Sequence, residues 1–135
     1  MPYCYRIDRG RRLVISTASG RLTLSDVIAH RDQLRNDPEF DPDFDRLIDT
    51  SDVTLADLSH DEIKLIGSPP HLFFSLQSRT ALIAPRAHVF GLARMLGVYL
   101  EASKPTQFQV FRDLTSALNW LNPDRLSISA RAAHQ

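Results

Sequence analysis

The sequence has little of several features that would point to a particular class of protein. Cys4 is its only cysteine, so we expect neither an intrachain disulfide nor a cysteine-ligated metal cluster. The 16 basic and 16 acidic residues balance to a formal net charge of zero, which argues against broad binding to nucleic acid or anionic membranes. No apolar run approaches the roughly 20 residues of a membrane-spanning helix, so stable membrane insertion is not expected.

The N-terminal segment also lacks the apolar stretch of a signal peptide, which predicts a cytoplasmic location. What remains is an ordinary globular composition, with 43% hydrophobic and 24% charged residues in 135 positions. A chain of this length can bury one core. We therefore expect one domain at residues 1–122, followed by a flexible C-terminal tail at residues 123–135.

The first quarter of the chain predicts a β-hairpin and a helix. Residues 3–7 and a run that starts at residue 13 have strand character, and a short glycine-containing turn joins them. Gly20 is expected to end the second strand. Thr23 and Asp26 then form a capping box at the start of a helix. Its predicted apolar face contains Leu24, Val27, Ile28 and Leu34, with His30 and Arg31 mostly on the opposite face.

The middle of the chain contains its most informative local signal. Residues 47–49 predict a buried strand, followed by a polar loop that continues to Ser59. Ser59 and Glu62 have the spacing of a second capping box, so a helix is expected just after Ser59. Residues 67–70 interrupt this helix, and residues 71–77 predict a second helical piece.

The rest of the chain alternates strands and helices. Residues 80–84 predict a strand buried on both faces, residues 86–102 a long helix, and residues 108–111 a further strand. Asp113 is expected to cap a last helix. Repeated strand–helix units produce parallel strands, so the prediction is a single α/β domain with a mixed five-stranded sheet.

The order and spacing of these segments resemble the SpoIIAA-like branch of the STAS superfamily, whose fold is also compared with Sec14-type lipid-binding domains. The resemblance covers about residues 3–121 and is carried by YRIDRGRRLV, GRLTLSDV, LIDTSDVT, RTALIAP, HVFGLARML and VFRDLTSALNWL. It implies a βα superhelix with helices mainly on one face of the sheet. It implies no conserved catalytic set. We also expect no cofactor.

In anti-sigma-factor antagonists of that superfamily, a serine at the start of the helix after the third strand is phosphorylated. By this resemblance, Ser59 is a candidate phosphoacceptor, and the expected partner-binding loop contains Asp49, Thr50, Ser51 and Asp57. Leu58 and His60 differ from the family motif, which has serine and glycine there. Helix capping by itself also explains the presence of Ser59.

A small-ligand site is the second hypothesis. Phe73 and Phe74 belong to an apolar stretch that could cover the core, line a pocket or form a partner surface. Arg79, Arg86 and Arg94 flank this region, where they could hold an anionic group or remain solvated surface charges.

Metal and catalytic sites are not predicted. Acidic residues between positions 41 and 52 have a spacing related to a calcium loop, but Arg46 occupies the position that requires glycine. No two histidines have metal-ligand spacing. Ser59, His60 and Asp61 are adjacent on a helix and diverge.

The sequence therefore leads to two hypotheses. The first is a non-catalytic STAS-like domain that binds a protein partner, including self-association as a dimer, through the surface around Ser59. The second is a carrier or sensor of a lipid or other small apolar or anionic ligand. Neither hypothesis includes catalysis.

Overall fold

One mixed sheet organises the parts of the chain that the structure, a computed structural model, describes: residues 3–68, 77–103 and 107–121. Its strands are β1 (Tyr3–Asp8), β2 (Leu13–Thr23), β3 (Asp45–Asp57), β4 (Arg79–Ile83) and β5 (Gln107–Phe111), and they lie in sequence order across the sheet. β1 pairs antiparallel with β2, and every other neighbouring pair is parallel. The predicted mixed five-stranded α/β fold is confirmed.

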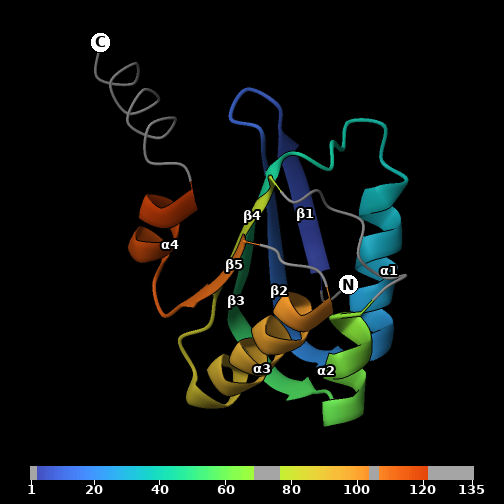
Figure 1. The fold of residues 1–135 in the computed structure, drawn as a ribbon, viewed down its shortest axis with the longest axis vertical. Coiled ribbons are helices and arrows are strands. Elements are labelled where there is room, and N and C mark those ends of the chain that lie inside the picture. The colour runs from blue at the N-terminus through green and yellow to red at the C-terminus, as the bar shows by residue number, and fades with distance from the viewer. Residues whose placement is uncertain (1–2, 69–76, 104–106, 122–135) are drawn as a thin grey trace.

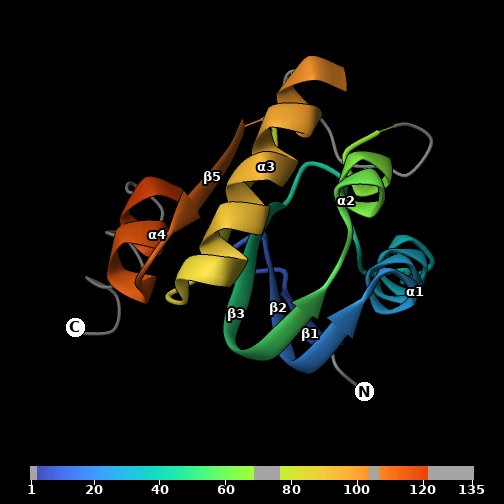
Figure 2. The same cartoon turned by 90° about the horizontal axis from the view of Figure 1, so that it is seen from below.

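Helices cover both faces of this sheet unequally. α1 (Leu24–Arg35), α2 (His60–Ile66) and α3 (Ala87–Ser103) lie on one face, and α4 (Leu114–Leu121) lies on the other (Figures 1 and 2). None of the helices in the described segments is both long and apolar enough to cross a membrane. The predicted helical piece at residues 71–77 lies almost wholly outside the described residues, and so does the predicted tail at residues 123–135.

Both predicted capping boxes are present. At α1, the Thr23 amide donates to Asp26 Oδ2 over 2.9 Å and the Asp26 amide donates to Thr23 Oγ1 over 3.4 Å. At α2, the Ser59 amide donates to Glu62 Oε1 over 2.9 Å and the Glu62 amide donates to Ser59 Oγ over 3.2 Å. Each box satisfies amides that a helix cannot pair internally, and so determines where the helix begins.

The core has one layer on each side of the sheet because successive residues of a strand point to opposite faces. Leu47 and Ile83 pack toward α4, whereas Ile48 and Leu82 pack toward α1–α3. The layer beneath α4 is the smaller one and includes Ala117 and Leu121. β4 is buried on both faces, as its continuous apolar run predicts.

The predicted loop between Asp49 and Ser59 was wrong. β3 continues to Asp57 and pairs with β2, which itself passes Gly20 and continues to Thr23. Two register shifts, between Thr17 and Ser19 and between Gly20 and Arg21, put extra residues on β3. Such bulges bend a strand pair, and Gly20 adopts the positive φ of 67° that glycine tolerates. The paired ends of β2 and β3 therefore curve away from the sheet toward α1 and α2 (Figure 2).

Candidate functional site

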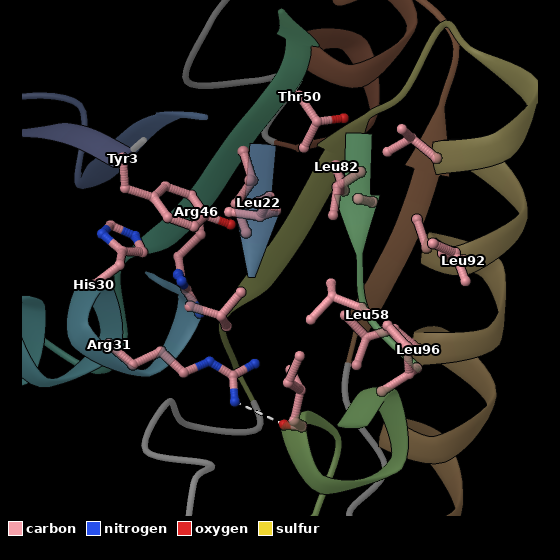
Figure 3. A pocket seen from close by; sticks show the side chains of 17 residues that line it. Tyr3, Leu22, His30, Arg31, Arg46, Thr50, Leu58, Leu82, Leu92 and Leu96 are labelled. Carbon is pink, nitrogen blue, oxygen red and sulfur yellow. Dashed lines mark hydrogen bonds between the residues drawn. The ribbon is translucent and has the colours of Figure 1, made fainter. Parts of the chain in front are cut away.

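A cavity of about 80 Å³ lies between the sheet, the curved β2–β3 ends and helices α1–α3 (Figure 3). Polar groups line one part of it: Tyr3 from β1, His30 and Arg31 from α1, and Arg46 and Thr50 from β3. Among the described residues, twelve apolar ones form the rest of the wall. They are Leu22, Val27, Ile48, Ala56, Leu58, Ile63, Ile66, Leu82, Val89, Leu92, Ala93 and Leu96.

Two buried arginines characterise the polar end of this cavity. Arg46 is 3% exposed and Arg31 is 8% exposed. The Arg31 guanidinium donates to the carbonyl oxygen of Ile66 over 2.6 Å, at the C-terminus of α2, where carbonyls have no partner within the helix. No aspartate or glutamate of the described segments lines the cavity. The described part of its wall therefore carries two buried positive charges and no acidic side chain.

His30 completes the polar end through three contacts. Its ring stacks on Tyr3 with centroids 4.2 Å apart and an interplanar angle of 8°, and it meets Tyr5 edge-on. Its Nε2 lies 3.1 Å from Ser16 Oγ. The other ring nitrogen, Nδ1, is buried and has no hydrogen-bond partner within the described residues. Figure 3 shows Tyr3, His30 and Arg46 close together, with Arg31 next to them.

Burial changes the protonation of these groups in consistent directions. It lowers the pKa of Arg31 and of Arg46 to about 10 each. Burial, together with the charges of Arg46 and Arg31, lowers the pKa of His30 to about 4. Burial also raises the pKa of the Tyr3 hydroxyl. Near neutral pH the polar end therefore consists of two cations, a neutral imidazole and a neutral phenol.

The residues predicted around Ser59 are not gathered in one loop. Ser59 is exposed and caps α2, and the exposed Asp57 at the end of β3 forms an ion pair with Arg21 at 2.5 Å. Asp49, Thr50 and Ser51 lie within β3, well before the helix start. Thr50 is buried and donates to the Ile83 carbonyl over 2.6 Å, and Asp49 accepts from Ser51.

The three arginines predicted to surround a ligand are also separated. Arg79 donates to the Trp120 carbonyl over 2.8 Å, on the α4 face of the sheet. Arg86 is exposed just before α3. Arg94 is exposed on α3 and lines a separate polar groove over β5. None of them lines the cavity, and the predicted pocket residues Phe73 and Phe74 lie outside the described part of the chain.

The two cavity arginines were not predicted as site residues, although the local sequence pattern indicates that both are buried. Val27, His30, Arg31 and Leu34 are the buried residues of α1 and follow the i, i+3, i+4, i+7 spacing of one helix face. The expected placement of His30 and Arg31 on the solvent side was therefore wrong. Arg46 and Leu47 are neighbours in a strand that is buried on both faces. Their side chains point to opposite faces, so the side chain of Arg46 is buried as well.

The described residues contain no group of three His, Cys, Asp or Glu side chains that could hold a metal ion. The Ser16–His30 pair resembles two members of a hydrolytic triad. However, Ser16 is 1% exposed and is not part of the cavity wall, so its hydroxyl is not presented to a ligand. The cavity wall instead combines two buried guanidinium groups with apolar side chains.

Comparisons with known proteins identify the fold. No family model matches the chain, and no curated protein matches it. Among solved structures, the chain is similar to an uncharacterised protein of the DUF3478 family from Shewanella loihica PV-4, described as having a SpoIIAA-like fold. The likeness has a TM-score of 0.58 and 21% identity, and covers 88% of this chain and 93% of that one. The chain thus has the SpoIIAA-like fold that its sequence resemblance implied.

Proposed function

We propose that this SpoIIAA-like domain is a non-catalytic binding domain that holds a small molecule with an apolar body and one anionic group. The observation that carries the proposal is the cavity, which combines twelve apolar residues with two buried guanidinium groups. Ligand sites in proteins are typically apolar concavities with a few polar groups that orient the ligand. Of the two hypotheses from the sequence, the geometry thus favours the carrier or sensor.

The size of the cavity restricts this proposal. A single water requires roughly 10–15 Å³ of such space, so the cavity of about 80 Å³ accommodates only a small ligand. The long acyl chains of a membrane lipid do not fit within it. The half-buried Leu58, Leu92 and Leu96 are the apolar wall residues nearest to solvent, and they are the natural side for ligand entry.

Ligand-observed NMR with a mixture of small neutral and anionic apolar compounds tests the proposal. Saturation transfer to at least one compound is expected for the wild-type protein. Ala93→Leu should abolish the signal because Ala93 is buried and lines the cavity, so added methyl groups occupy it. Ala102→Leu, near the exposed end of the same helix, is the matched control. Absence of transfer to every compound would refute the proposal.

A protein-interaction role remains the second candidate, and one observation favours it. Leu55 and Leu65 are 47% and 41% exposed and lie within six positions of the exposed Ser59. Exposed apolar side chains beside a modifiable hydroxyl fit a partner surface that phosphorylation regulates. Intact-mass measurement after incubation with cell kinases, with Ser59→Ala as control, tests the modification. An unchanged wild-type mass would contradict it.

A further inference from the structure

The protonation and charge of the cavity wall narrow the ligand to one chemical class. Every charged group that the described residues contribute to the wall is a cation: Arg31 from α1 and Arg46 from β3. The other polar groups there are Tyr3, His30 and Thr50, and Thr50 already donates to the Ile83 carbonyl. The two guanidinium groups lose their water when the protein folds. An anion that enters the cavity can therefore bind them without a further cost of desolvating the arginines.

We infer that the cavity binds a small monocarboxylate, whose carboxylate lies between Arg31 and Arg46 and whose apolar body contacts the α3 side of the wall. This inference rests on the proposed function and specifies its ligand. Guanidinium groups match the planar, two-oxygen geometry of a carboxylate. Leu92 and Leu96 of α3, with Leu82 of β4, provide the apolar contacts (Figure 3).

His30 provides a second observation that points to a ligand in this position. Its Nδ1 is a buried polar atom with no hydrogen-bond partner in the described segments, and such atoms are rare in folded proteins. When the Ser16 hydroxyl donates to Nε2, Nδ1 carries the proton and can donate to an acceptor. A carboxylate oxygen is a suitable acceptor for this proton, since the ring itself faces the cavity.

Size and polarity favour a carboxylate over a phosphate. The cavity of about 80 Å³ has room for roughly five to eight water-sized groups. A phosphate ester would fill much of that space with its oxygens and would leave the twelve apolar wall residues without a matching partner. A carboxylate with a body of a few carbon atoms satisfies both parts of the wall.

Calorimetric titration of the complete chain with a homologous series tests this inference. At about pH 7.5, acetate, butanoate, hexanoate and decanoate are all ionised. Butanoate and hexanoate should bind best, because acetate leaves the apolar wall unfilled and decanoate exceeds the cavity. Hexanoate should bind about tenfold or more tightly than hexanamide, which has the same shape without the charge.

Substitution of single arginines tests which of them produce the preference for a carboxylate over an amide. Arg46→Met should remove the preference for hexanoate over hexanamide, and Arg94→Met should retain it because Arg94 is exposed and lies outside the cavity wall. Circular dichroism shows whether each variant is folded. If Arg46→Met is unfolded, Arg31→Met provides the same comparison.

The outcomes distinguish this inference from the proposed function. Equal affinity for hexanoate and hexanamide would overturn the inference, and so would tighter binding of inorganic phosphate or of decanoate. The proposed function would survive tighter binding of decanoate, because decanoate also has an apolar body and one anionic group. Equal affinity for hexanoate and hexanamide would remove its anionic part, and a preference for inorganic phosphate would remove its apolar part. Failure of every compound to bind would instead refute both.

Discussion

The pH dependence of the free energy of unfolding tests whether the polar end of the cavity is desolvated, because His30 lies there. The unperturbed pKa of histidine is 6.5, and in the folded protein burial and the two nearby arginines lower the pKa of His30 to about 4. Between these two values the unfolded chain binds more protons than the folded protein. Stability therefore rises with pH through this window, and it is lost as the pH falls from about 6.5 toward about 4.

The expected magnitude follows from the two pKa values. At about pH 8 the imidazole is neutral in both states, and His30 contributes no pH dependence. At about pH 5 it is protonated in nearly every unfolded chain but in only about one folded molecule in ten. The free energy of unfolding should therefore fall by about 2 kcal/mol between those pH values because of His30 alone.

Urea unfolding of the wild type and His30→Gln, monitored by the fluorescence of the single Trp120, measures this contribution. Glutamine can still bond Ser16 Oγ but does not titrate. All other titrating groups are present in both proteins, so their contributions largely cancel. The wild type should lose about 2 kcal/mol more than His30→Gln between about pH 8 and about pH 5. His60→Gln, at an exposed position of α2, controls for the loss of one histidine.

Equal losses in the wild type and His30→Gln would refute the reasoning. That result would mean that the imidazole takes up its proton in the folded state as easily as in the unfolded one. The cavity end would then be hydrated or open, and the argument that its two arginines form a desolvated anion site would fail as well.

Five further substitutions, at four positions, test the packing and capping of the fold by urea unfolding. Ser59→Ala should lower the free energy of unfolding by about 1 kcal/mol, whereas Ser59→Asp should retain the cap; equal losses would contradict the capping role. Gly91→Ala should stabilise α3 by up to about 1 kcal/mol, because the added Cβ meets no atom within 4 Å. Gly97→Ala should gain less or destabilise, since its Cβ would lie 3.1 Å from Cδ1 of Phe108, and equal gains would contradict this. Thr50→Val should cost about 1–2 kcal/mol by leaving the Ile83 carbonyl without its donor, and no loss would contradict that hydrogen bond.

The burial of two arginines has a consequence for stability as well as for binding. Burying a charged group costs free energy, and replacing buried ionic groups by apolar ones frequently stabilises proteins. Such groups therefore tend to mark functional positions. In this domain both buried guanidinium groups lie at the polar end of the cavity, which is why Arg31 and Arg46 carry the ligand proposal.

Features that depend only on neighbouring residues could be predicted from the amino-acid sequence. Thr23 and Asp26, like Ser59 and Glu62, can satisfy each other's amides within one helical turn, so both helix starts were predictable. The alternation of the hairpin and the continuous apolar run of β4 reflect burial of one or both sheet faces. From these local features the order of elements, and with it the α/β class, followed.

The course of β3 and the direction of the buried arginines depend on contacts between elements that are distant in the sequence. A polar stretch such as residues 50–57 reads as a loop, because nothing local shows that β2 extends alongside it with two bulges. Arg31 and Arg46 are charged, and residue type alone favours the surface for both. Their local spacing in α1 and β3 favours the inward side instead, and the packing of these elements against distant ones resolves this conflict.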